Sequence, residues 1–495
     1  MAKKYQNFIG GKWVDAFSGE TFENRNPANW QETLGEFPDS GENEVDTAVQ
    51  CAREAFDAWR LTPAPARGDI IRKAGDIMSQ RKQEIARDMT REMGKVLTET
   101  LGDVQEGIDT AYYAASEGRR LFGHTVPSEL PNKFNMSMRI PMGVAGIITP
   151  WNFPMAIPTW KIFPALVCGN CVVFKPASDT PLTATTFVEI LLEAGVPEKV
   201  VNLVHGRGSR VGTPLVNHPD VNLISFTGST AVGKAISKAA GDTLKRVSLE
   251  LGGKNAQIVM EDADLDLALE GVLWGAFGTT GQRCTATSRL ILHEKVYDRF
   301  MEMLLNATRN LKLGNGLNAE SDVGPMINRG QIETVQNYVN IGKEEGAQIL
   351  IGGSDFKEGD CANGWYFLPT IFTEVTPKMR IAKEEIFGPV LSVLRVKSFE
   401  EAIKTLNNTK YGLSSSIYTN DVNRGFQAMR DIEAGITYIN GPTIGAEAHM
   451  PFGGVKETGN GHREGGWEVY EFYTETKTVF VDFSGKLQRA QIDNY

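Results

Sequence analysis

The stretch best suited to chemistry is Gly281–Thr285, which contains Cys284 and follows an apolar, helix-like run from Leu265 to Gly278. A thiol at the end of such a run is predicted to lie on an exposed turn, where it can meet a substrate. Most lone cysteines are inert and buried. Here glycines flank the thiol, and Arg283 beside it is expected to stabilise a thiolate, so the pattern favours a nucleophile.

The length and composition are those of an ordinary globular chain. The 495 residues predict roughly three lobes at about 150 residues each. The formal net charge of -10 argues against a nucleic-acid or anionic-membrane partner, because both require a basic face. No stretch approaches the ~18 consecutive apolar residues of a membrane span, and no apolar run follows Lys3 and Lys4, so neither a membrane segment nor a secretory leader is expected.

The cysteines and histidines narrow the chemistry further. Five scattered cysteines, an odd number, favour reduced thiols and a cytoplasmic location. Cys168 and Cys171 have the spacing of a redox motif, but they join an apolar segment to a strand, so the two residues between them are interpreted as a turn. None of the six histidines has the spacing of a metal ligand, and no metal is expected.

From Cys171 to Leu251 short apolar strands alternate with helices, a pattern typical of βαβ units on a parallel sheet. The predicted strands are Val172–Phe174, Val200–Val204, Leu223–Thr227 and Val247–Leu251. The predicted helices are Pro181–Ala194, Gly208–Val216 and Ser229–Ala240. In such a sheet a dinucleotide binds at the carboxyl ends of the strands.

The loop Gly228–Gly233 is the best candidate for holding phosphate. It follows a strand and opens a helix, the context in which backbone N–H groups and a helix N-terminus bind an anion. It lacks the G-x-G-x-x-G spacing, and the alternative that its glycines only make a tight turn stays open. After Lys254 a second α/β pattern surrounds Cys284, and Thr476–Phe483 near the C-terminus is typical of an edge strand.

Six motifs, in order along the chain, resemble those of the aldehyde dehydrogenase superfamily. They are Pro150–Pro154 (PWNFP), Phe226–Thr230 (FTGST), Leu249–Lys254 (LELGGK), Gly281–Cys284 (GQRC), Glu384–Pro389 (EEIFGP) and Pro451–Gly454 (PFGG). The resemblance implies an α/β fold with a variant Rossmann cofactor domain, an α/β catalytic domain and a β bridging arm. It implies that the cofactor domain spans residues 1–123 and 145–252, the catalytic domain residues 253–474, and the arm residues 124–144 and 475–495. In the family this arm builds homodimers or homotetramers.

The resemblance also implies roles for single residues. Cys284 would be the nucleophile, Glu250 the general base, and Asn152 with the Cys284 backbone N–H the oxyanion donors. Chemistry supports this set, because thiolate attack on an aldehyde makes an oxyanion and the later thioester needs a water deprotonated by a carboxylate. The implied cofactor-binding residues are Trp151, Lys175, Ser178, Arg210, Gly228, Ser229, Gly233, Leu251, Glu385 and Phe387.

The function expected from the resemblance is oxidation of an aldehyde to the acid with NAD(P). Two alternatives from other classes remain: a relative that passes the acyl group to coenzyme A, and a non-catalytic protein on the same fold. Glu250 weighs against the first, and intact Cys284 and Asn152 weigh against the second. A cofactor-free cysteine hydrolase is disfavoured, because no histidine lies in the motifs around the thiol.

Substrate and cofactor choice depend on a few charged positions. Arg119, Arg120 and Arg283 are candidates for gripping a substrate carboxylate, which would suit a semialdehyde acid. In NAD-preferring relatives a glutamate commonly stands where this chain has Ser178, and a serine does not repel a 2′-phosphate. With Arg207 and Arg210 nearby, and Asp179 expected to cap the next helix, NADP is predicted to be accepted and preferred, with NAD also usable.

Overall fold

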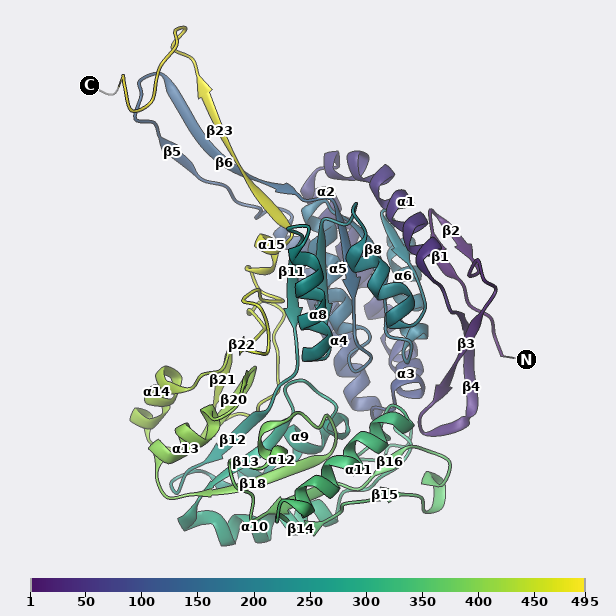
Figure 1. The fold of residues 1–495 in the computed structure, drawn as a ribbon, viewed down its shortest axis with the longest axis vertical. Coiled ribbons are helices and arrows are strands. Elements are labelled where there is room, and N and C mark those ends of the chain that lie inside the picture. Colours follow the sequence, from purple (N-terminus) through teal and green to yellow (C-terminus); the bar gives the residue numbers. More distant parts are fainter. Residues whose placement is uncertain (1, 494–495) are drawn as a thin grey trace.

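The computed structural model describes residues 2–493 and contains two seven-stranded sheets and a three-stranded arm (Figure 1). The first sheet is formed by residues 7–250 and the second by residues 255–439. The chain passes from one sheet to the other between Glu250 and Asn255. The α/β fold class predicted from the sequence is confirmed.

The first sheet has the strand order β11-β10-β7-β8-β9-β1-β2. Its strands are β1 (Asn7–Ile9), β2 (Lys12–Val14), β7 (Val144–Ile148), β8 (Cys171–Lys175), β9 (Val201–Leu203), β10 (Leu223–Thr227) and β11 (Arg246–Glu250). The five strands from β11 to β9 are parallel, and the β1–β2 hairpin closes one edge in antiparallel fashion. The strand order reverses between β7 and β10, so the crevice at their carboxyl ends is a topological switch point, where ligands bind in open α/β sheets.

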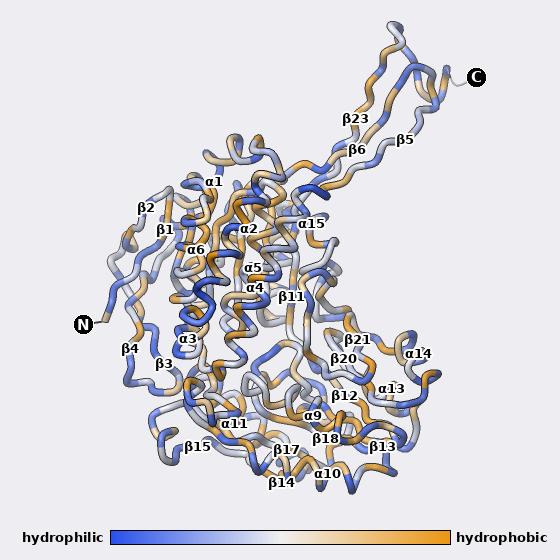
Figure 2. The backbone as a smooth tube through the Cα atoms, turned by 180° about the vertical axis from the view of Figure 1, so that it is seen from behind, coloured by the Kyte–Doolittle hydropathy of each residue, from blue (hydrophilic) through white to orange (hydrophobic). Residues whose placement is uncertain are grey.

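Helices cover this sheet. They are α1 (Glu42–Leu61), α2 (Ala64–Gln80), α3 (Lys82–Met93), α4 (Leu97–Glu117), α5 (Ala156–Cys168), α6 (Pro181–Ala194), α7 (Thr213–Asn217) and α8 (Thr230–Gly241). Every residue of β7 and β8 is buried, as expected for continuous apolar strands covered by helices. Figure 2 shows apolar residues gathered along α5 and its neighbours. A two-stranded hairpin, β3 (Thr21–Asn26) with β4 (Asn29–Pro38), lies beside this body.

The second sheet has the order β14-β17-β18-β13-β12-β20-β21, in which β14 alone is antiparallel to its neighbour. Its strands are β12 (Asn255–Val259), β13 (Thr287–His293), β14 (Gln348–Ile351), β17 (Thr370–Thr373), β18 (Val390–Val396), β20 (Ser414–Tyr418) and β21 (Ile436–Ile439). Its helices are α9 (Leu265–Phe277), α10 (Glu294–Arg309), α11 (Arg329–Glu344), α12 (Arg380–Lys383), α13 (Phe399–Asn407) and α14 (Val422–Asp431). Short pairs complete the lobe: β15 (Asp355–Phe356) with β16 (Tyr366–Phe367), and β19 (Tyr411–Gly412) with β22 (Val455–Lys456).

The arm projects away from both lobes in Figures 1 and 2. It consists of β5 (Thr125–Pro127), β6 (Lys133–Pro141) and β23 (Thr474–Asp482), all antiparallel. Among the described strands β23 pairs only with β6, which confirms the edge strand predicted from the sequence. The short helix α15 (Val469–Phe472) before it packs into the core of the first lobe. The domain boundaries drawn from the resemblance stay a prediction.

Most elements predicted between residues 171 and 251 are confirmed within one or two residues. One differs: the stretch predicted as a helix at Gly208–Val216 begins as a π-helical turn over Gly208–Gly212 before α7. Cys168 ends α5 and Cys171 begins β8, so the turn interpretation of this pair is confirmed, and both thiols are buried and free. Within residues 2–493 no helix is both long and apolar enough to cross a membrane.

The two sheets bring the chemical motifs together at their facing ends. Glu250 is the last residue of β11, and Cys284 lies three residues before the start of β13. The loops that follow β7 and β10 also point into this region, since parallel strands end at one edge of a sheet. The site therefore lies between the carboxyl end of the first sheet and the amino end of the second.

Candidate active site

Cys284 follows a turn with unusual backbone conformation. After α9, Thr279, Thr280 and Gly281 all have left-handed φ values, of 52°, 57° and 66°. Consecutive left-handed residues other than glycine are costly and persist only where their surroundings hold them. At Gly281 a side chain is excluded as well, because an added Cβ would lie 2.2 Å from the Gly388 carbonyl oxygen. No local sequence pattern predicts this strain.

Buried polar groups hold the turn in place. The Glu99 carboxylate accepts a 2.7 Å hydrogen bond from the Thr279 backbone N–H, and Asn255 Nδ2 donates at 2.7 Å to the Cys284 carbonyl. The side chain of Gln282 is fully buried and bonds three backbone groups of neighbouring loops. These contacts fix the backbone on both sides of the thiol.

The thiol itself is half-buried, so the exposed turn predicted for Cys284 is wrong. Burial, together with the nearby charges of Glu250 and Glu385, raises the pKa of the Cys284 thiol to about 12. A thiol with that pKa needs a base or a cation to become a nucleophile at neutral pH.

Arg283 does not supply that cation, which corrects a second expectation. Its Nη2 lies 3.2 Å from Glu99, and its Nε donates at 2.8 Å to Thr279 Oγ1. The guanidinium also packs between the rings of Phe153 and Trp274, 5.4 Å and 5.0 Å from their centroids. Glu99, 184 residues away in the sequence, draws the side chain away from the thiol.

Glu250 stands at the end of β11 with its carboxylate buried. Neither carboxylate oxygen has a hydrogen-bond partner among the described residues. Burial, and after it the charge of Glu464, raises the pKa of Glu250 well above its usual range, whereas Lys161 and Arg463 lower it. A buried carboxyl with a raised pKa and no partner is suited to exchange a proton with a water or a thiol.

An ion pair that shifts the pKa of Glu250, Lys161 with Glu464, was not predicted from the sequence. Lys161 Nζ lies 2.6 Å from Glu464 Oε1, and both side chains are almost fully buried. The available signal was a lysine inside α5, an otherwise apolar helix. A lysine buried in such a helix requires an anionic partner.

Asn152 lies beside the nucleophile loop. Its side chain is buried, and Nδ2 donates a 3.1 Å hydrogen bond to the Gln282 carbonyl oxygen. An amide nitrogen carries two N–H groups, so one N–H of Asn152 is not used by this bond. The loop is fixed by Asp103, which accepts a 2.7 Å bond from the Ala156 backbone at the start of α5.

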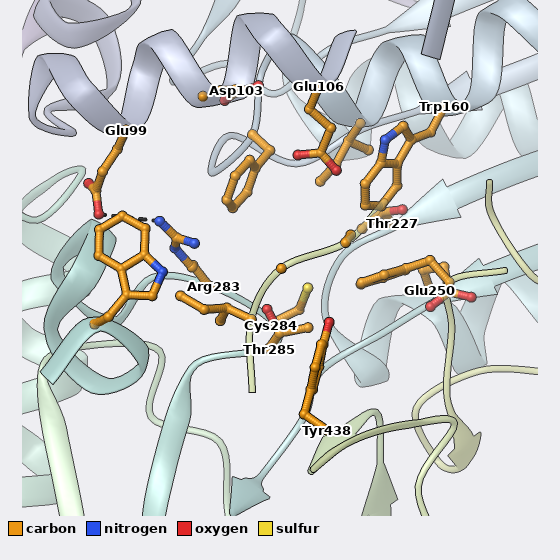
Figure 3. Close-up of a pocket in the computed structure, with 18 of the residues that line it drawn as sticks. Glu99, Asp103, Glu106, Trp160, Thr227, Glu250, Arg283, Cys284, Thr285 and Tyr438 are labelled. Atoms are coloured by element: carbon orange, nitrogen blue, oxygen red, sulfur yellow. Dashed lines mark hydrogen bonds and ion pairs between the residues drawn. The ribbon is translucent and has the colours of Figure 1, made fainter. Parts of the chain in front are cut away.

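A cavity of about 220 Å³ opens above the thiol (Figure 3). Cys284 and Glu250 both line it. Its walls include the aromatic side chains Phe153, Trp160, Trp274, Tyr438 and Phe452 and the acidic side chains Glu99, Asp103 and Glu106 of α4. Arg283 also lines it, but Arg119 and Arg120 do not: they bind Asp69 and Glu117 outside the cavity. The expectation that Arg119 or Arg120 grips the substrate is therefore wrong.

A second cavity of about 330 Å³ reaches Cys284 from the switch point between β7 and β10. Six of the predicted cofactor residues line it: Trp151, Gly228, Ser229, Leu251, Glu385 and Phe387. Ser229 caps the N-terminus of α8, whose backbone N–H groups are suited to phosphate. Gly233 does not line the cavity but packs against Leu251, which does; a Cβ at Gly233 would lie 2.4 Å from the Leu251 side chain. The polar groups of this lining are suited to part of a nucleotide that reaches the thiol.

Lys175, Ser178 and Arg210 lie apart from this cavity, around the end of β8. Burial lowers the pKa of Lys175 to about 8. Ser178 Oγ donates to the Gly206 carbonyl at 3.1 Å. Arg210 is paired with Glu20 and, at 3.1 Å, with Asp39, so its charge is already compensated.

Asp179 does not cap α6 as expected. Its carboxylate accepts a 2.9 Å bond from Asn328, and the α6 N-terminus is capped by Glu92 instead, which accepts from the N–H groups of Leu182 and Thr183. Glu92 comes from α3, and contacts between distant helices leave no local sequence pattern.

Comparison with known proteins agrees with this geometry. The model of the aldehyde dehydrogenase family matches residues 13–479. The alpha-ketoglutaric semialdehyde dehydrogenase of Bacillus subtilis is 45% identical, over 96% of this chain and 98% of the relative. The 2,5-dioxopentanoate dehydrogenase of Saccharolobus solfataricus is 42% identical, over 97% and 99%.

Solved structures show the same fold. Betaine aldehyde dehydrogenase from Staphylococcus aureus, in complex with NAD+, superimposes with a TM-score of 0.95 at 33% identity, covering 98% of this chain and 96% of that chain. The resemblance read from the six motifs is confirmed, and with it the expectation of an enzyme that oxidises aldehydes with a nicotinamide nucleotide. This chain belongs to the aldehyde dehydrogenase family.

Proposed function

We propose that this enzyme oxidises a semialdehyde acid, with the substrate carboxylate bound by Arg283. The observation that carries the proposal is the position of Arg283: it is the only lysine or arginine among the described residues that line the cavity above Cys284. The names of the Bacillus and Saccharolobus relatives, both semialdehyde acid dehydrogenases, support the same substrate class.

Arg283 is held in a way that leaves donors free. Glu99 and Thr279 bond Nη2 and Nε, and Nη1 forms no hydrogen bond with any described residue. A guanidinium has five N–H donors and binds carboxylates in a fixed geometry. Asp103 is paired with buried Lys95 at 2.7 Å, and Glu99 offsets part of the Arg283 charge, so binding of a substrate carboxylate depends on the free Nη1 donors.

The chemistry follows from the groups around the thiol. Cys284 attacks the aldehyde carbon, and its proton passes to a base, for which buried Glu250 is the candidate. Asn152 Nδ2 and the Cys284 backbone N–H would donate to the oxyanion. When bound, the nicotinamide supplies the hydride acceptor for oxidation to the thioester. Glu250 releases that proton to solvent and, again as a carboxylate, takes a proton from the water that releases the acid.

The choice between the two nucleotides is part of the proposal. Ser178 carries no charge that would repel a 2′-phosphate, which supports use of NADP. The carboxylates of Glu20 and Asp39 compensate Arg210, and Asp179 lies near Lys175, which removes much of the positive charge expected there. We therefore propose that the enzyme accepts NADP as well as NAD, with a weaker preference for NADP than the sequence predicted.

A second candidate substrate is a cationic aldehyde. Aromatic rings and carboxylates line the cavity, a combination that attracts quaternary ammonium groups. The Staphylococcus structure is named for betaine aldehyde, which is such a cationic aldehyde, and this supports testing the candidate. Arg283 argues against this candidate, because it would repel a cation.

The test is a comparison of kcat/KM for 2,5-dioxopentanoate, pentanal and betaine aldehyde in wild type, Arg283→Gln and the control Arg120→Gln. Arg283→Gln should lower kcat/KM for the semialdehyde acid by about 10²-fold more than for pentanal, because loss of the pair with Glu99 affects both substrates and loss of the carboxylate contact affects only the acid. Arg120→Gln should change neither. Equal losses for the acid and for pentanal in Arg283→Gln would refute carboxylate binding at this residue.

We also propose a homo-oligomer, a dimer or a tetramer, in the cytoplasm. The arm supports association, because Phe134, Phe480 and Val481 are exposed on its strands. The five free cysteines support a reducing compartment. Light scattering of the purified enzyme measures the number of subunits, and a monomer would refute the proposal.

A further inference from the structure

Three acidic residues of α4 form one stripe on the wall of the substrate cavity. Glu99, Asp103 and Glu106 are spaced four and three residues apart, which places them on the same face of the helix. All three line the cavity that holds Cys284 (Figure 3).

Two of the three carboxylates have partners that account for their burial in the cavity wall. Glu99 holds the nucleophile turn and Arg283, and Asp103 binds Lys95 and the start of α5. Glu106 differs. Its Oε1 is buried without a hydrogen-bond partner among the described residues, and no ion pair of Glu106 is present in this part of the chain. In Figure 3 its carboxyl points into the cavity, across from Arg283 and above Cys284.

We propose that Glu106 determines substrate specificity by donating a hydrogen bond to the 2-oxo group of a 2-oxo semialdehyde acid. This inference rests on the proposed function, in which Arg283 binds the carboxylate and Cys284 attacks the aldehyde at the other end. The polar group between these ends then meets the free carboxyl of Glu106. Leaving a buried donor unpaired is costly, so a substrate without the oxo group is bound less well.

The charges around Glu106 favour the protonated form. Asp103 and Asp109 on its own helix repel a second negative charge, whereas Lys95 and Arg283 attract it, and the Tyr438 hydroxyl faces it across the cavity. Burial, and after it Asp103, raises the pKa of Glu106 to about 8. A protonated carboxyl is a donor, and an ionised one accepts only. The group therefore donates below about pH 8 and loses that ability above it.

The test compares kcat/KM for 2,5-dioxopentanoate with that for 5-oxopentanoate, which lacks only the 2-oxo group. Because Cys284 and Glu250 serve both substrates, their titration cancels in the ratio of the two values. In wild type at pH 7 the ratio should be about 10–100 in favour of the oxo acid, and it should fall above pH 8. The control is Glu302→Gln, an exposed carboxylate on α10 that does not line the cavity, which should leave the ratio unchanged.

Two variants separate the donor from its charge. Glu106→Gln keeps an N–H donor that does not titrate, so the ratio should stay high at pH 7 and become independent of pH. Glu106→Ala removes the donor, and the ratio should fall to about 1, the value for two substrates bound alike. Activity with pentanal reports whether each variant is folded.

Other outcomes overturn the inference. A ratio that survives in Glu106→Ala, a wild-type ratio that is flat with pH, or a Glu106→Gln variant as poor as Glu106→Ala would each exclude a donor at this position. A loss confined to betaine aldehyde would show an ionised Glu106 that binds cations. The proposed function has a separate test: it fails if wild type does not prefer the semialdehyde acids over pentanal. The comparison of the two acids with each other tests only the role of Glu106.

Discussion

Replacing Glu99 by alanine tests whether this carboxylate holds the left-handed turn before Cys284. The change removes the acceptor of the Thr279 N–H and the partner of Arg283. Both side chains of this ion pair are buried: Glu99 is 2% exposed and Arg283 is 11% exposed. Removing one partner of a buried ion pair costs about 3–5 kcal/mol, because the other charge stays buried and unpaired.

That cost should appear in stability and in activity. If most of it is expressed in unfolding, the rate of irreversible thermal inactivation should rise by about 10²–10³-fold, since about 1.4 kcal/mol is a factor of ten. The turn at Thr279–Gly281 should relax, and a displaced thiol should lower kcat by about 10²-fold. Glu99→Gln, which keeps an acceptor for Thr279, should show a smaller loss of both.

The assay is residual activity after timed heating, with single-turnover rates measured on the unheated enzyme. Asp109→Ala on the same helix is the control for a change on the helix surface and should behave as wild type. Inactivation and turnover of Glu99→Ala within a factor of three of wild type would refute the idea that the carboxylate holds this turn.

Three further predictions concern the remaining site groups. Asn152→Ala should lower kcat by about 10²–10³-fold with little change in cofactor Kd, as for loss of one oxyanion donor, and an unchanged kcat would remove Asn152 from that role. Glu464→Gln removes a charge that raises the pKa of Glu250, so the rise of the hydrolysis rate with pH should move to lower pH; a shift to higher pH would contradict the assigned coupling. Ser178→Glu should shift the ratio of kcat/KM for NADP over NAD toward NAD, and an unchanged ratio would show that this position does not face the adenosine ribose.

The sequence predicted the parallel sheet well because its signal is local. The strands β8, β9 and β10 are short apolar runs, each followed by a helix with its own turn residues, and these patterns do not depend on distant contacts. The switch point between β7 and β10 then follows from topology, and it explains why the loops after these strands line one cavity.

The side-chain pairs could not be predicted in the same way. Arg283 is adjacent to Cys284 in the sequence, and its expected role failed because Glu99, on another helix, attracts it. Lys161 and Glu464 are 303 residues apart, and only the fold shows that they meet near Glu250. Glu106 has no local pattern that separates it from a solvated helical carboxylate.

The central claim is that oxidation passes through an acyl group on Cys284 that Glu250 helps to hydrolyse. The most direct measurement is rapid quenching of Glu250→Gln with aldehyde and cofactor, followed by mass spectrometry of the peptide that contains Gly281–Thr285. We predict a slowed burst of reduced cofactor and an equal amount of acyl group on Cys284, because the variant weakens thiol attack but slows hydrolysis more. A burst without an adduct on Cys284, or an adduct on another residue, would contradict the account.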